Sequence, residues 1–353
     1  MNHLGKIIAT SKNGIHEITA LGNRVEIDVD KPLPVTNETI FDLASITKIL
    51  ATTNLMMNLV DQKIVNVTDL VCRYLPGWNS SEKSEIRIHH LLSHRSGLPP
   101  WRPLYINHMD KPEAFSAIEK LALETPIDSV RKYSDLGFMV LGQIIETLFQ
   151  EGLELAFESK LKEILNLDRT SFAIPLEMAN VAGSSLGDIH EFNMVASGNP
   201  YPVSEKVNDF DRWRKHVLVG EVNDGNAFHT FNGVSGHAGL FSTAKDILKV
   251  CEIYLQSYKD DSFFKSNTIK NFTEPGRDPL QGLGFRNWKI LVDGREHLVF
   301  GHTGFTGVSF GFIPEIEFGL VMLTNRLHTY GEPIKTEELW LSCLKDSLSR
   351  IVP

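Results

Sequence analysis

The sequence predicts a mixed α/β (α+β) fold in which both chain termini build one antiparallel sheet, flanked by helices, with a mostly helical lobe inserted between them. Apolar and polar residues alternate near the start of the chain and again near its end, which is typical of half-buried strands. The middle instead repeats its apolar residues at helical spacing. Strands at both ends with helices between them favour one sheet shared by the two termini.

The first 60 residues predict strands followed by a helix. Residues 6–10, 14–18 and 24–28 alternate and are separated by Asn13-Gly14 and Gly22-Asn23, so we expect an antiparallel meander. A helix follows Pro34, because the next apolar residues recur at helical spacing: Ile46, Ile49, Leu50, Met56, Met57 and Val60.

The remaining segments complete the predicted order of elements. Helices are expected at 88–93, 112–124, 136–149 and 153–165, with Gly97 as the C-cap of the segment 91–99 and a surface loop over 193–207. Thr243 and Asp246 resemble a capping box at the start of a further helix. Strands at 288–292, 297–300, 307–313 and 318–324 precede a last helix at 336–348. We expect one catalytic unit over residues 1–353, with a sheet lobe at about 1–60 plus 240–353 and a helical lobe at about 61–239.

Composition excludes several classes of function. The chain has 353 residues, with 35 basic and 44 acidic side chains and a net charge of −9, which argues against nucleic-acid binding as its main function. With 42% hydrophobic and 22% charged residues it is expected to be neither disordered nor embedded in a membrane. The first 28 residues contain no apolar run of signal-peptide length, which favours the cytoplasm unless a signal was removed. Three scattered cysteines argue against a disulfide framework and a cysteine zinc site, and no metal or organic cofactor is expected.

A serine and a lysine at the start of the first helix indicate nucleophilic catalysis. Ser45 and Lys48 are three residues apart and share a helix face, so the amine can reach the hydroxyl. A serine hydroxyl needs such a partner before it attacks a carbonyl carbon. The spacing alone is weak, because S-x-x-K occurs seven times, starting at Ser45, Ser80, Ser129, Ser159, Ser242, Ser262 and Ser342.

Two later tripeptides select Ser45 from this set. Tyr133-Ser134-Asp135 precedes a predicted helix, and His302-Thr303-Gly304 lies between predicted strands. With the segments 41–48, 91–99, 236–243 and 301–307, the order of these motifs resembles the serine β-lactamase and penicillin-binding-protein superfamily, in its class C-like branch. The resemblance covers about residues 5–348 and implies a β-lactamase-like fold.

The resemblance also implies a role for each motif residue. Ser45 is the acylated nucleophile, Lys48 shares or removes its proton, and Tyr133 shuttles protons. His302 hydrogen-bonds Tyr133 or the substrate, and the backbone N–H groups of Ser45 and Phe305 form the oxyanion hole. The substrate-binding residues are expected to be Asp135, Thr303, Gly304 and His237.

Two departures from the family pattern affect the expected substrate. Asp135 stands where penicillin-recognising members usually have asparagine, and it can pair with Lys48 and raise its pKa. His302 stands where lysine is common, so a fixed charge for a substrate carboxylate is missing. Both favour esterase-like hydrolysis of a small-molecule ester or amide over the alternative of a β-lactamase or DD-carboxypeptidase. A non-catalytic binding or sensor protein on the same scaffold stays open, as does the oligomeric state.

Overall fold

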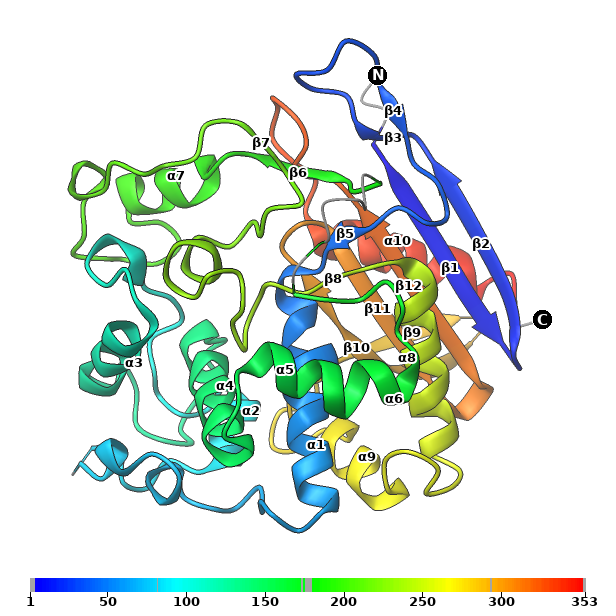
Figure 1. Cartoon of the computed structure of the whole chain (residues 1–353). Helices are drawn as coiled ribbons and strands as arrows, with labels where there is room; N and C mark the ends of the chain where they lie inside the picture. Colours follow the sequence, from blue (N-terminus) through cyan, green and yellow to red (C-terminus); the bar gives the residue numbers. More distant parts are fainter. Residues whose placement is uncertain (1–3, 81, 173, 175–179, 293, 352–353) are drawn as a thin grey trace.

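The fold is organised around one six-stranded antiparallel sheet (Figure 1). The computed structural model describes residues 4–80, 82–172, 174, 180–292 and 294–351. The strand order is β2-β1-β12-β11-β10-β9. In that order the strands are Ile15–Leu21, Lys6–Lys12, Phe318–Thr324, Val308–Ile313, Arg295–Gly304 and Arg286–Val292.

The two ends of the chain meet inside this sheet, as its second and third strands. β1 pairs with β12 in a regular antiparallel register that runs from Lys6 opposite Thr324 to Lys12 opposite Phe318. The predicted sheet, built from both termini, is therefore confirmed. β12 is buried along its whole length, since its successive side chains enter two different apolar clusters.

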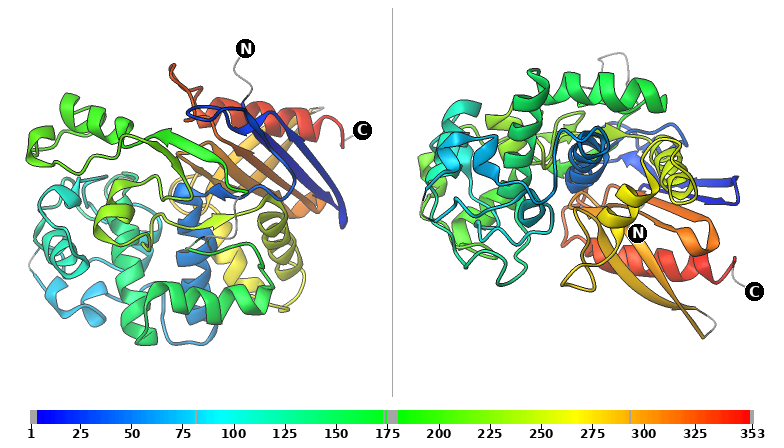
Figure 2. Two further views of the ribbon diagram at one scale, coloured as in Figure 1. Left: turned by 45° about the horizontal axis from the view of Figure 1, so that its top comes forward. Right: turned by 90° about the horizontal axis from the view of Figure 1, so that it is seen from below.

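Two helices cover the opposite faces of the sheet (Figure 2). α8 (Ala244–Ser257) packs against β1, β11 and β12, and Val321 and Leu323 point to this side. α10 (Thr336–Leu348) packs on the other face, where Trp340 meets Leu320 and Met322. Thr243 accepts a hydrogen bond from the backbone N–H of Asp246, so the predicted cap of α8 is present.

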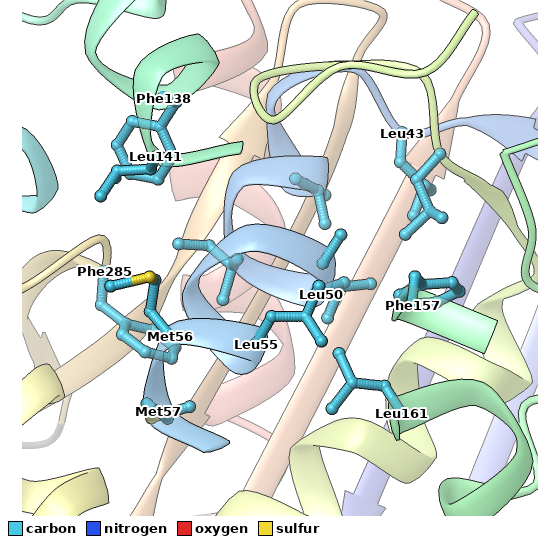
Figure 3. Close-up of a cluster of buried hydrophobic side chains, with 14 of the residues drawn as sticks. Leu43, Leu50, Leu55, Met56, Met57, Phe138, Leu141, Phe157, Leu161 and Phe285 are labelled. Carbon is cyan, nitrogen blue, oxygen red and sulfur yellow. The ribbon is translucent and has the colours of Figure 1, made fainter. Parts of the chain in front are cut away.

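The helix that begins near Ser45 runs through the centre of the larger apolar cluster (Figure 3). It opens as a 3-10 turn, η1 (Ala44–Ile46), continues as a π-helix, η2 (Lys48–Thr53), and ends as α1 (Asn54–Asp61). Side chains from α4 (Asp135–Phe149), α5 (Leu153–Phe157), η6 (Glu158–Lys162) and the segment before β9 surround it: Phe138, Leu141, Phe157, Leu161 and Phe285. This packing holds the helix start against the sheet.

The other helices lie mostly beside the sheet, in the middle of the chain (Figure 1). They include α2 (Ile88–Leu92), α3 (Lys111–Lys120), α6 (Glu163–Leu165), α7 (Ile189–Ser197) and α9 (Ser266–Thr273). Short two-stranded pairs join β5 (Phe41–Asp42) to β8 (Phe241–Ser242), and β6 (Gly183–Leu186) to β7 (Val217–Val219). None of the helices in these described ranges is both long and apolar enough to cross a membrane.

Three local predictions are wrong. The third N-terminal strand is β3 (Asn23–Val25), which pairs with β4 (Leu33–Pro34) and does not extend the meander. The predicted loop at 193–207 begins only after α7, which ends where Gly198 adopts φ +66°. α2 stops at Leu92 without help from Gly97, because His94 already takes a left-handed conformation at φ +58°.

Candidate active site

The turn before Ser45 is strained and held from both sides. Ala44 has φ +44°, which is unfavourable for a residue with a side chain. One carboxylate oxygen of Asp42 accepts a hydrogen bond from the Ala44 N–H at 2.8 Å, and the other accepts one from the Asn223 N–H at 2.6 Å. Burial raises the pKa of Asp42 to about 6. Such anchoring fixes the position of the Ser45 hydroxyl.

The buried Lys48 ammonium lies among several oxygen acceptors. Nζ lies 2.9 Å from Ser45 Oγ, 3.1 Å from the His237 carbonyl oxygen and 2.7 Å from Asp135 Oδ1. A protonated amine has donors and no acceptor, so surroundings made of oxygen acceptors match the charged form. The predicted proximity of Ser45, Lys48 and Asp135 is therefore present.

Electrostatics agree with a charged Lys48 beside a neutral Tyr133. Burial alone would lower the pKa of Lys48, but the Asp135 carboxylate and Tyr133 outweigh it and raise that pKa above the usual lysine value. Burial raises the pKa of Tyr133, although Lys48 opposes the change. The Tyr133 side chain hydrogen-bonds both Lys48 and Ser45, and its ring centroid lies 5.0 Å from Lys48 Nζ.

The start of α4 brings Tyr133 and Asp135 to Lys48. Ser134 caps the helix, since its hydroxyl oxygen accepts a hydrogen bond from the Gly137 N–H at 3.3 Å and donates one to the Pro99 carbonyl at 2.7 Å. Because the cap is Ser134, the Asp135 carboxylate is available for the ion pair with Lys48. Asp135 is the first residue of the helix.

The third motif lies at the end of β10, against the Ser45 turn. A Cβ on Gly304 would lie 2.5 Å from the Leu43 carbonyl oxygen, so glycine permits this close approach. Phe305 follows directly, with 47% of its surface exposed. Its N–H is thus on the strand end that contacts the nucleophile turn, and its role in an oxyanion hole stays a prediction.

His302 is buried beside Tyr133 without the predicted hydrogen bond to it. The two ring centroids are 6.1 Å apart, and Nδ1 of His302 lies 2.7 Å from the Thr303 carbonyl oxygen. Burial, with Lys48 and Arg286 nearby, holds the pKa of His302 well below its usual value. The imidazole is therefore neutral near pH 7.

His237 occupies a different place from the predicted substrate-binding position. Its carbonyl contacts Lys48, while its imidazole is 1% exposed. Nε2 lies 2.9 Å from Asp224 Oδ1 and Nδ1 lies 2.8 Å from Ser235 Oγ. With both ring nitrogens engaged, His237 holds Lys48 through its backbone and does not line the exposed part of the site.

Two residues at the site were missed by sequence reasoning. Arg286, on the edge strand β9, donates to Thr303 Oγ1 at 3.0 Å and forms an ion pair with Glu337 at 3.2 Å. His94 packs its ring 4.5 Å from that of Tyr133. His94 lies within the segment 91–99, which resembles the family, but nothing in the sequence alone showed which ring it meets.

Comparisons with known proteins agree with this geometry. A family model described as Beta-lactamase matches residues 16–342. The chain is 32% identical over 322 residues to an N-acetylmuramyl-L-alanine amidase of Bacillus subtilis (strain 168), covering 85% of this chain and 70% of that protein. It is 30% identical over 346 residues to a putative D-alanyl-D-alanine carboxypeptidase of Escherichia coli (strain K12), covering 89% and 75%.

Solved structures share the fold at lower sequence identity. A class C β-lactamase superposes with a TM-score of 0.74 at 17% identity, covering 99% of this chain and 93% of that chain. The octameric penicillin-binding protein homologue from Pyrococcus abyssi gives 0.70 at 22% identity, covering 98% and 74%. From the family match and the two sequence relatives, we conclude that this chain belongs to the β-lactamase family and is a serine hydrolase.

Proposed function

We propose that the chain hydrolyses small esters or amides through an acyl-enzyme on Ser45. The observation that carries this proposal is the contact of Ser45 Oγ with a buried lysine whose other partners include Asp135, a backbone carbonyl and Tyr133. A hydroxyl held by hydrogen bonds between a cation and a neutral phenol is prepared for nucleophilic attack.

The charge states support a concerted role for Tyr133. As Ser45 Oγ bonds to the substrate carbonyl carbon, its proton passes to the Tyr133 oxygen, and the phenol proton passes to the departing oxygen or nitrogen. Water then attacks the ester, gives a proton to Tyr133, and Tyr133 returns one to Ser45 Oγ. The Lys48 ammonium stabilises the partial negative charge on Tyr133 during both steps. In this scheme Lys48 acts as a fixed cation and need not be the general base.

The balance of charges favours an uncharged substrate. Lys48 is paired with Asp135, Arg286 is paired with Glu337, and His302 is neutral. Each of these described cations already has a carboxylate partner. None of them is therefore free to attract the carboxylate of a substrate. This arrangement supports esterase-like hydrolysis as the first candidate.

A second candidate is a carboxypeptidase acting on peptides that end in D-alanine. Arg286 touches Thr303, so a cation does stand beside the third motif although His302 is uncharged. The E. coli relative is named a putative D-alanyl-D-alanine carboxypeptidase. A substrate carboxylate that displaced Glu337 from Arg286 would be recognised by a bidentate charge-assisted pair.

A comparison of three substrates distinguishes the two candidate functions. We would measure kcat/KM for an aryl acetate, a penicillin and an acyl-D-Ala-D-Ala peptide, in the wild type and in Arg286→Gln. The first candidate predicts ester turnover that survives the substitution and little peptide cleavage. Peptide cleavage that drops at least tenfold in Arg286→Gln, with ester turnover unchanged, would establish the second candidate instead.

A further inference from the structure

His94 lies against the proposed proton shuttle without being part of any catalytic motif. It follows α2, is 2% exposed, and packs its ring 4.5 Å from Tyr133 and 5.2 Å from Phe138. A buried imidazole in contact with an active-site phenol can influence that phenol through its hydrogen bonds. Which nitrogen of His94 carries the proton therefore matters.

The backbone determines the tautomer of His94. The N–H of Ser134 donates a hydrogen bond to Nδ1 of His94 at 3.1 Å. A nitrogen that accepts a hydrogen bond carries a lone pair, so the single proton of the neutral ring is on Nε2. Nε2 is buried and has no hydrogen-bond partner within the described part of the chain. His94 thus presents a buried donor without an acceptor.

His302 is held as the opposite tautomer. Its Nδ1 lies 2.7 Å from the Thr303 carbonyl oxygen, which can only accept, so Nδ1 carries the proton. Nε2 of His302 therefore has a lone pair, and it too is buried with no partner among the described residues. The two rings that contact Tyr133 consequently offer one free donor and one free acceptor.

Both rings stay neutral because of the charges that face them. Lys48, Arg131 and Arg286 lie close to His94, and Lys48 and Arg286 lie close to His302. Burial and these cations keep the pKa of each histidine well below its usual value. The tautomers assigned from the backbone contacts therefore apply across the neutral range.

We propose that His94 is a positioning residue whose Nε2–H is joined to Nε2 of His302 through one water molecule, and so holds both His302 and Tyr133 in place for proton transfer. A buried donor or acceptor without a partner destabilises the folded protein. A hydrogen bond that joins a donor to an acceptor removes this cost for both. The consequence for catalysis rests on the proposed function of Ser45 and Tyr133. The assignment of the tautomers does not depend on that proposed function.

The tautomers can be measured without any substrate. ¹⁵N-labelled histidine spectra, assigned with His94→Asn and with His302→Gln, should show a neutral Nε2–H ring for His94 and a neutral Nδ1–H ring for His302 at pH 7. An Nδ1–H ring at His94, or a charged ring at either position, would overturn the inference. Because this experiment needs no turnover, its failure is distinct from a failure of the proposed function.

Two substitutions separate positioning from simple packing. In His94→Gln the amide can replace the Nε2 donor, whereas in His94→Asn it can replace only the Nδ1 acceptor that holds Ser134. We expect kcat/KM to fall roughly tenfold in His94→Asn and to stay within about threefold of wild type in His94→Gln. Activity kept by Asn and lost in Gln would show that His94 serves only to hold Ser134.

The pH profile gives a second readout. A donor bound to Nε2 of His302 favours its neutral form, so losing that donor makes His302 easier to protonate. The acidic limb of kcat/KM should therefore move to higher pH in His94→Asn and not in His94→Gln. His90→Asn is the matched control, because His90 also accepts a backbone N–H through Nδ1, from Arg87 at 3.0 Å, while its ring contacts His89. If the acidic limb of the kcat/KM profile stayed at the wild-type pH in His94→Asn, this result would contradict the positioning role.

Discussion

At the scale of single residues, the pairing of Lys48 with Asp135 decides the charge state of the site. A buried lysine without a counter-charge would lose its proton easily, because burial disfavours the ammonium. The Asp135 carboxylate at 2.7 Å reverses this preference. The protein can therefore keep a cation in contact with the nucleophile, while the Lys48–Asp135 pair adds no net charge to the site.

Asp135→Asn should move the alkaline limb of the activity profile to lower pH. Without the carboxylate, burial dominates and the pKa of Lys48 falls, so the ammonium that stabilises Tyr133 is lost at lower pH. We expect a movement of at least about one pH unit in kcat/KM. If instead the acidic limb moved to lower pH and neutral activity rose, Lys48 would be a general base and not a fixed cation.

The site residues that could be predicted from the sequence belong to short motifs, in which the partners are close together in the chain. Ser45 with Lys48, and Tyr133 with Asp135, are close in the chain, and the structure brings the two pairs together. Arg286 was missed because its contact with Thr303 depends on the pairing of β9 with β10. The relation of His94 to Tyr133 depends likewise on tertiary packing, which spacing along one sequence does not encode.

At the scale of elements, the site depends on how closely β10 approaches the turn before Ser45. Thr306, just after β10, donates a hydrogen bond to the Asp42 carbonyl at 2.8 Å, and Gly304 lies against Leu43 and Ala44. The helix itself was predictable from its apolar spacing. Its 3-10 and π turns were not, because the spacing of apolar residues does not distinguish them from α-helical turns.

Gly304→Ala should separate β10 from the nucleophile turn. The added Cβ would lie 2.5 Å from the Leu43 carbonyl oxygen and the same distance from the Val308 side chain. We expect the free energy of unfolding to drop by about 1–3 kcal/mol in urea titrations, with a larger loss of acylation rate than of stability. Gly276→Ala is the control, since nothing lies within 4 Å of its Cβ. Full activity in Gly304→Ala would contradict the close approach.

At the scale of the whole molecule, a group of partly buried acids joins α7 to the segment behind Lys48. Glu191 on α7 accepts a hydrogen bond from the Gly225 N–H at 2.7 Å, and Asp224 lies against His237, whose carbonyl binds Lys48. Burial, together with the Asp224 and Asp188 carboxylates, raises the pKa of Glu191 above its usual value of 4.5. Stability and the site are therefore linked through pH.

Glu191→Gln should make stability less sensitive to pH. The folded state holds the Glu191 proton more tightly than the unfolded state. The contribution of Glu191 to folding stability is therefore complete below its usual pKa and is lost as the pH rises through its raised pKa in the folded state. The wild type should therefore lose more unfolding free energy than Glu191→Gln between about pH 5 and pH 8 in urea titrations. The exposed Glu38→Gln is the control for loss of one charge. If the unfolding free energy changed with pH in the same way in wild type and Glu191→Gln, this linkage would be excluded.

Intact-mass analysis during turnover of an aryl ester, followed by peptide mapping, tests whether Ser45 is the nucleophile. We expect a transient mass increase equal to the acyl group, located on the peptide that contains Ser45. Ser45→Ala should show neither the adduct nor the turnover, while its folded fraction is unchanged. An adduct on another residue, or a Ser45→Ala variant that keeps wild-type turnover, would contradict the assignment of Ser45 as the nucleophile.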